Sequence, residues 1–137
     1  MPVTADTLRS VPLFSGLPDR DLAHLAATMR DRSYSEGAAV TAEGGRGSWF
    51  FVIESGDADV VVDGNKVSTL SAGDYFGEIA LIDDGTRTAS VMAATDLRCW
   101  VLPPWEFRPW VKENPEVAWA LLETLAKRLR AAEQRVD

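Results

Sequence analysis

The spacing of apolar residues divides the chain into three zones. In the first zone, LPDRDLAHLAATM repeats apolar residues at intervals of three and four, which predicts helix within residues 4–30 and Pro18 in a first helical turn. Residues 31–103 form the second zone, where short β-rich runs are broken by glycine or aspartate. From Pro104 the spacing is helical to the end of the chain. The pattern predicts a helical lead-in, a β-rich centre and a helical end.

Antiparallel β structure is the interpretation that the central zone favours. Its apolar runs are SWFFVIES, DADVVVD, KVSTL, TASVMAATD and LRCWVLP. The breaks fall at Ser55-Gly56, Asp63-Gly64-Asn65 and Ala72-Gly73-Asp74, where turns with positive φ are expected. Regular short runs favour a sandwich or barrel over alternating strands and helices. We predict one domain over residues 1–137, with a lead-in at 1–30, an antiparallel β-barrel or jelly roll (double-stranded β-helix) at 31–103, and a hinge with a long C-terminal helix at 104–137.

The predicted C-terminal helix carries apolar residues at heptad spacing. Asn114 and Pro115 are typical of a helix start. The seam consists of Ala118, Leu122, Leu125, Leu129, Ala132 and Val136. A seam of about three heptads is at the lower limit for a coiled coil. Two interpretations remain open: the helix packs this face on its own barrel, or it self-associates around a two-fold axis in a homodimer.

Composition and charge exclude several function classes. The formal net charge of −7 argues against broad affinity for nucleic acid or acidic lipid, although one local cation suffices for a small anion. Cys99 is the only cysteine and His24 the only histidine, so we predict no internal disulfide, no metal site and no enzyme. Neither a signal peptide nor a long uncharged apolar run is present, which predicts a cytoplasmic location without membrane contact.

The stretch FGEIALIDDGTRTAS holds the candidate chemistry. Glu78 lies in an apolar run, where a carboxylate is costly to bury unless it is paired, and Arg87 follows a glycine turn. The two residues either pair with each other or bind a ligand together. Arg87 suits a phosphate diester, ionised Glu78 accepts from a hydroxyl, and Gly77 allows backbone to approach a ligand. One phosphate with one sugar hydroxyl describes a nucleotide, and a single arginine matches a cyclic diester.

This stretch resembles the phosphate-binding cassette of the cyclic nucleotide-binding domain family. Within the cassette at 76–90, the matching residues are Phe76, Gly77, Glu78, Ile79, Ala80, Leu81, Arg87, Thr88 and Ala89. VPLFSGL, SWFFVIESGDADV and NPEVAWALLETLAKRL extend the similarity to the sensory half of the catabolite activator protein (Crp-Fnr) group. The resemblance therefore covers nearly the whole chain.

The resemblance implies a role for each cassette residue. Glu78 is expected to bind the ribose 2′-hydroxyl and Arg87 the cyclic phosphate. Thr88 is expected to touch phosphate or base, while the backbone around Gly77, Ile79 and Ala80 completes the cradle beside Phe76 and Ala89.

The resemblance also implies that the final helix caps the base and forms the dimer interface of bacterial regulators. The candidate cap residues are Leu129, Ala132 and Glu133. This chain departs from those regulators because Ala132 and Glu133 stand where a pair of hydroxyl residues contacts adenine. Since members with a threonine at the position of Thr88 also accept guanine, cAMP and cGMP both remain candidate ligands.

The function implied by the resemblance is that of a non-catalytic regulatory sensor. A cyclic nucleotide binds, and the C-terminal helix relays the event to an unknown partner or effector domain. The alternative is a ligand-free dimerisation or interaction module that retains the fold, in which Glu78 and Arg87 simply pair.

Overall fold

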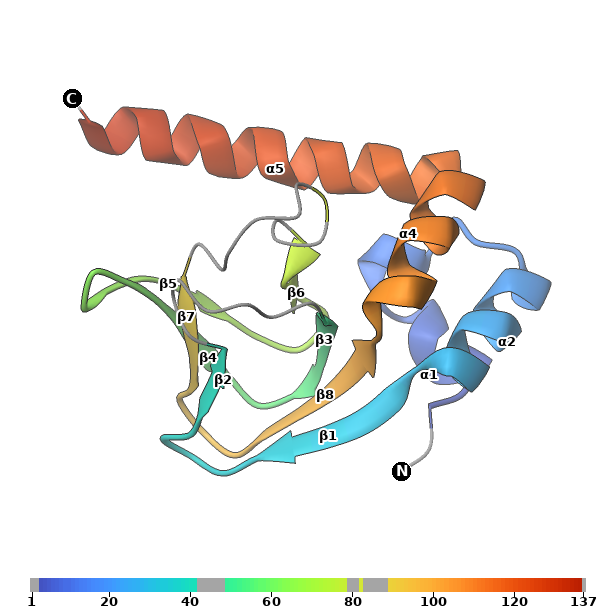
Figure 1. The fold of residues 1–137 in the computed structure, drawn as a ribbon, viewed down its shortest axis with the longest axis horizontal. Helices are drawn as coiled ribbons and strands as arrows, with labels where there is room; N and C mark the ends of the chain where they lie inside the picture. The colour runs from blue at the N-terminus through green and yellow to red at the C-terminus, as the bar shows by residue number, and fades with distance from the viewer. Residues whose placement is uncertain (1–2, 42–48, 79–81, 83–88, 137) are drawn as a thin grey trace.

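The computed structural model describes residues 3–41, 49–78, 82 and 89–136, with side chains as far as Glu133. Two β-sheets face each other, and helices cover one side of the pair (Figure 1). Helices α1 (Ala5–Arg9), η1 (Pro12–Phe14) and α2 (Asp19–Thr28) come first, and α4 (Pro104–Glu113) and α5 (Pro115–Val136) come last. This arrangement follows the three zones of the apolar pattern.

The described strands form two antiparallel sheets of four. The first sheet has the order β1-β8-β3-β6 and contains β1 (Arg30–Tyr34), β8 (Leu97–Leu102), β3 (Phe50–Ser55) and β6 (Tyr75–Phe76). The second has the order β2-β7-β4-β5 and contains β2 (Ala39–Thr41), β7 (Ser90–Ala93), β4 (Ala58–Val62) and β5 (Asn65–Leu70). The predicted mainly β jelly roll with flanking helices is confirmed. The two sheets stay separate in the described residues, so it is a sandwich and not a closed barrel.

Alternation along the first sheet creates two cores. One face of the sheet packs on the helices, where Phe50 and Trp100 of the sheet share a core with Leu121 of α5. The other face packs on the second sheet through residues such as Phe51 and Cys99. Successive strand residues point to opposite faces, so neighbours such as Phe50 and Phe51 enter different cores. The centre of the first sheet is therefore covered on both sides, which explains the nearly continuous apolar residues of β3 and β8.

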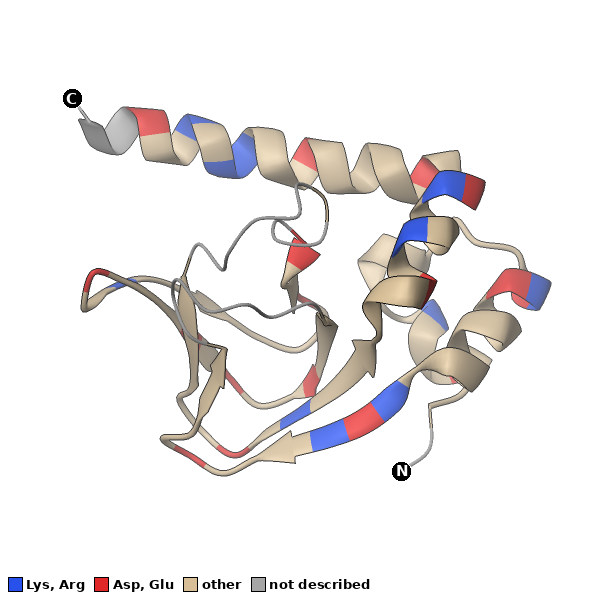
Figure 2. Cartoon of the chain, in the orientation of Figure 1, with Lys and Arg blue, Asp and Glu red and all other residues tan. Residues whose placement is uncertain are grey.

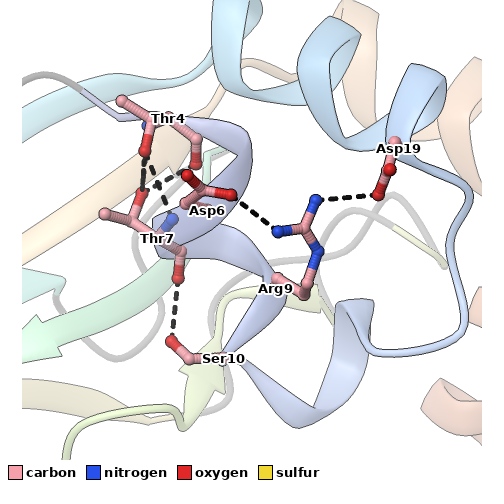
Figure 3. A network of polar contacts seen from close by, with 6 residues as sticks. All are labelled: Thr4, Asp6, Thr7, Arg9, Ser10 and Asp19. Atoms are coloured by element: carbon pink, nitrogen blue, oxygen red, sulfur yellow. Dashed lines mark hydrogen bonds and ion pairs between the residues drawn. The ribbon is translucent and has the colours of Figure 1, made fainter.

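A polar network fixes the helical lead-in (Figure 3). The Thr4 hydroxyl accepts a hydrogen bond from the Thr7 backbone N–H at 3.2 Å, and the Thr7 hydroxyl oxygen accepts from the Thr4 N–H at 2.9 Å. This reciprocal capping box starts α1. Arg9 then donates to Asp19 at 2.7 Å and ties α1 to the first residue of α2. Pro18 precedes α2 as its N-cap, so the prediction that placed it in the first turn is wrong by one residue.

The predicted turns have the expected backbone conformation. Asp63 and Gly64 have φ values of 52° and 78° between β4 and β5, as a tight two-residue hairpin requires. Gly56 and Gly73 have φ values of 90° and 91°. At Gly56 there is also no room for a side chain, because a Cβ would lie 2.2 Å from the carbonyl oxygen of Asp96. All three predicted breaks are confirmed.

The last helical zone is interrupted at Asn114, where α4 ends and α5 begins with Pro115 as predicted. Val117 and Leu121 anchor α5, with exposed fractions of 1% and 2%. Leu122 and Leu129 of the heptad seam are 56% and 60% exposed and do not pack on the chain's own sheets. No helix in the described part of the chain is long and apolar enough to span a membrane.

Candidate functional site

The candidate site begins at β6, which leads from the first sheet toward α5. Phe76 pairs with Phe51 of β3 and stacks on its ring with centroids 4.7 Å apart. Tyr75 enters the core on the helix side, because it points to the opposite face of the strand. Gly77 then has a φ of 96°, and Glu78 has helical backbone. A paired strand and a left-handed glycine thus place Glu78 directly after the sheet.

Glu78 is 1% exposed, and no other polar or charged residue among those described is buried. Arg128 of α5 donates a hydrogen bond to its Oε1 in a close ion pair. Its Oε2 is also buried but accepts no hydrogen bond from any described residue. A buried carboxylate oxygen without a donor carries a desolvation cost. The carboxylate therefore has one oxygen held by α5 and one available to a hydrogen-bond donor.

Arg128 contacts the strand before Glu78 as well as Glu78 itself. It donates to the backbone oxygen of Tyr75 at 3.3 Å, and its guanidinium carbon lies 5.6 Å from the centroid of the Tyr75 ring. Burial raises the pKa of the Tyr75 hydroxyl, which keeps this phenol neutral. Figure 2 shows a red segment at the end of β6 below α5, whose blue bands lie in its C-terminal half. Arg128 thus joins the candidate site to the C-terminal helix.

The sequence interpretation paired Glu78 with Arg87 or with a ligand, and it missed Arg128. One signal pointed to such a residue: a carboxylate in an apolar run needs a cation, and α5 carries several. The spacing of residues does not distinguish Lys127, Arg128 and Arg130, because the choice depends on how α5 is rotated about its axis. The buried residues Val117 and Leu121 set that rotation and turn Arg128 toward the cassette.

The described residues include part of the predicted cassette. Phe76, Gly77 and Glu78 lie together at the end of β6, and Ala89 is half-buried just before β7. Ile79, Ala80, Leu81, Arg87 and Thr88 lie outside the described residues. Their roles, including any contact between Arg87 and Glu78, remain predictions.

The candidate base-cap residues lie on the same helix as Arg128. Leu129 follows it directly and is 60% exposed. Ala132 and Glu133 are exposed one turn further along α5. Arg128 ties this part of α5 to Glu78 and Tyr75. The cap itself remains a prediction.

Other reactive side chains lie away from this site. Cys99 is fully buried between the two sheets, and burial raises the pKa of its thiol to about 12. His24 is on the exposed side of α2. In the described ranges, no three His, Cys, Asp or Glu side chains form a group suited to a metal ion. Glu78 and its surroundings are therefore the candidate site with the best-defined chemistry.

Comparison with known proteins gives consistent matches. A model of the cyclic nucleotide-binding domain matches residues 31–114. The cAMP-dependent protein kinase regulatory subunit of Colletotrichum orbiculare is 39% identical over 95 residues, covering 68% of this chain and 24% of that protein. The regulatory domain of Toxoplasma gondii PKA with cAMP has a TM-score of 0.81 at 26% identity, covering 90% of this chain and 48% of that one. The catabolite activator protein of Thermus thermophilus has a TM-score of 0.80 at 29% identity, covering 92% of this chain and 62% of that one.

The matched segment spans about a quarter of the kinase regulatory subunit, so the similarity concerns a domain and not that whole protein. The family match contains both sheets and the segment that follows β6 with Glu78. The structural matches extend it to the flanking helices, including α5. The chain belongs to the cyclic nucleotide-binding domain family.

Proposed function

We propose that this chain is a regulatory sensor domain that binds a 3′,5′-cyclic nucleotide, cAMP or cGMP, in the segment 76–90. Binding is relayed through α5 to a partner protein or effector domain, and the chain catalyses no reaction of its own. We further propose a cytoplasmic location. The family membership supports this proposal, as do two of its similar proteins, the kinase regulatory subunit and the PKA regulatory domain solved with cAMP.

One observation carries the proposal: the buried Oε2 of Glu78 accepts no hydrogen bond from a described residue. A hydroxyl group of the ligand supplies the missing donor. Because the carboxylate is already desolvated, such a hydrogen bond is formed without further loss of water around Glu78. The sugar 2′-hydroxyl is the hydroxyl that a 3′,5′-cyclic nucleotide leaves free.

The relay follows from the two oxygens of the same carboxylate. Oε1 is bound by Arg128 of α5, and Oε2 is the proposed acceptor of the sugar hydroxyl. A ligand that repositions Glu78 therefore changes the hydrogen bonds that hold α5 against β6. The Tyr75 carbonyl bond and the ring contact of Arg128 change with it. The contacts of Arg128 thus differ between the ligand-free and the ligand-bound state, and any ligand-driven shift of α5 requires such a difference.

Titration calorimetry with cAMP, cGMP and 5′-AMP tests the proposal. cAMP and cGMP carry the cyclic phosphate diester with adenine or guanine as the base, whereas 5′-AMP carries a dianionic open phosphate. We expect binding of at least one cyclic nucleotide and much weaker binding of 5′-AMP. Absence of heat and of a melting shift with both cyclic nucleotides would contradict the proposal.

A second candidate function is dimerisation through α5, in which the fold serves as a frame. It is favoured by Trp119, Leu122 and Leu129, which are 64%, 56% and 60% exposed on this helix. Exposed apolar residues on one helix are typical of an interface. Sedimentation velocity with and without cAMP tests it: a dimer in both conditions supports an α5 interface, and a monomer in both contradicts it.

A further inference from the structure

Two arginines and two tryptophans form a surface cluster at the edge of the first sheet opposite the cassette. The cluster consists of Arg30 and Arg32 on β1, Trp49 just before β3, and Trp105 on α4. In the order β1-β8-β3-β6, β1 and β6 occupy opposite edges, so this arginine–tryptophan cluster is separate from Glu78. It has no role in the function proposed above.

Trp49 lies at the centre of the cluster and contacts the other three side chains. The guanidinium carbons of Arg30 and Arg32 lie 5.6 and 5.2 Å from the centroid of the Trp49 ring. The rings of Trp49 and Trp105 meet edge to face, with centroids 5.9 Å apart and an angle of 70° between their planes. Cation–π contact orients both guanidinium groups without using their N–H donors, so these can still bind a further partner.

The two arginines share a face because they alternate along β1. Arg30 is opposite Val101 of β8, and Arg32 is opposite Cys99, both of which point toward the second sheet. Asp31 is opposite Trp100, which points toward the helices. The basic, acidic, basic banding of β1 is visible in Figure 2. The intervening carboxylate therefore points away from the two guanidinium groups.

Neither arginine has a carboxylate partner within the described part of the chain. The ion pairs observed among described residues include those of Arg9, Arg20, Lys66 and Arg128, and none involves Arg30 or Arg32. Both Arg30 and Arg32 are exposed, and the Trp105 side chain is 63% exposed. Arginine and tryptophan are the residues most enriched at energetically important positions of protein interfaces. The cluster thus combines interface-type side chains with two positive charges that have no carboxylate partner among the described residues.

Charge decides which class of partner fits. A chain with a formal net charge of −7 repels nucleic acid and acidic membranes over most of its surface, and two arginines do not reverse that. An acidic protein segment needs only a local contact. Carboxylates complement the two guanidinium groups in charge and geometry, and apolar parts of the segment contact the exposed face of Trp105.

We propose that the arginine–tryptophan cluster docks an extended acidic segment of a partner protein. Alternate residues of a strand are about 7 Å apart, so the segment carries carboxylates at positions i and i+2 to meet Arg30 and Arg32 together. In the described sheet β1 is an edge strand, and no described strand lies beyond it to cover this approach. The competing interpretation is that the arginines only shield Trp49 and the sheet edge.

The probe is the peptide acetyl-Thr-Glu-Thr-Glu-Thr-amide, with acetyl-Thr-Gln-Thr-Gln-Thr-amide as its uncharged match. Each is titrated into ¹⁵N-labelled protein at low salt while the indole N–H signals are recorded. We expect the glutamate peptide to shift the signals of Trp49 and Trp105, with half-saturation at about 1 mM because exposed ion pairs are weak. The shifts should shrink at high salt.

Matched variants separate the two interpretations. Arg30→Gln with Arg32→Gln should weaken peptide binding about 10-fold or more, whereas Arg20→Gln with Arg130→Gln removes the same charge elsewhere and should leave binding unchanged. Should the first variant not fold, Trp105→Ala removes an exposed ring and should weaken binding several-fold. Equal binding of the glutamine peptide, undiminished binding by the arginine variant, or no binding by the wild type would overturn the proposal. Cyclic nucleotide binding, measured in parallel, should be unchanged in all variants.

Discussion

Arg128 on α5 donates a hydrogen bond to the buried carboxylate of Glu78, which lies 50 residues earlier in the sequence. The ion pair spans two elements that are otherwise distinct, the segment after β6 and the C-terminal helix. The Glu78 side chain is 1% exposed, whereas the Arg128 side chain is 39% exposed. Water can therefore solvate Arg128 when Glu78 is removed, but it has little access to Glu78 when Arg128 is removed. That difference determines what each substitution does.

Arg128→Gln should lower the free energy of unfolding of the ligand-free protein by about 3 kcal/mol, because it leaves the buried Glu78 carboxylate without its cation. Urea titration measures the change. Glu78→Gln should cost less, since water can solvate the partly exposed Arg128. Arg130→Gln, two residues along α5 and exposed, is the control and should change stability by less than about 0.5 kcal/mol. Equal effects at Arg128 and Arg130 would show that the ion pair contributes nothing.

Arg87→Lys separates a ligand site from a structural charge pair. Lysine keeps the charge but loses the planar fork of donors, so affinity for a cyclic nucleotide should fall about 10- to 100-fold while the melting temperature changes little. Calorimetry and thermal unfolding on the same samples measure both quantities. Parallel losses of affinity and stability would favour the ligand-free module.

The sequence predicted the fold and the family well because their signals are local. Turn residues such as Gly56 and Gly64 mark strand ends directly, and the cassette is one continuous stretch. Three strands were missed, namely β1, β2 and β6. The residues of β1, RDRSY, are polar and mostly exposed because it is an edge strand, and β2 and β6 are too short to show a period.

The contacts of α5 could not be predicted because they depend on its rotation against the sheet. The heptad pattern identified the helix and an apolar seam along it. The fully buried residues of the helix, Val117 and Leu121, lie outside that seam. This choice exposes Leu122 and Leu129 and directs Arg128 to Glu78. A pattern of spacings gives the faces of a helix but not which face meets the sheet.

Gly56 should tolerate alanine far less well than Gly64. Both have positive φ, at 90° and 78°, so each substitution costs about 1 kcal/mol of backbone strain. A Cβ at Gly56 meets the backbone oxygen of Asp96 at 2.2 Å, whereas at Gly64 it meets nothing within 4 Å. Gly56→Ala should therefore cost at least about 3 kcal/mol in urea unfolding. Equal costs would contradict the close approach of the two backbone segments.

Cys99 should be unreactive in the folded protein. Burial raises the pKa of its thiol from an ordinary 9.0 to about 12, so the thiol stays protonated. At pH 8, iodoacetamide should label it only after addition of urea. Since the folded pKa lies above the unfolded one, the thiol's contribution to stability is complete below pH 9 and is lost as pH rises toward 12. Between pH 9 and 12, the free energy of unfolding should fall less for Cys99→Ala than for the wild type. Rapid labelling of the native protein by iodoacetamide would contradict the burial of Cys99.

The contact between Glu78 and the sugar hydroxyl is the central claim, and 2′-deoxy-cAMP tests it most directly. Calorimetry compares cAMP with its 2′-deoxy form on the wild type and on Glu78→Ala, with cGMP and its 2′-deoxy form used if guanine is preferred. The wild type should prefer the hydroxylated ligand by about 10-fold or more, because a buried acceptor is left unpaired without it. Glu78→Ala should bind both forms weakly and about equally. A wild-type protein that binds the two forms with equal affinity would contradict the account.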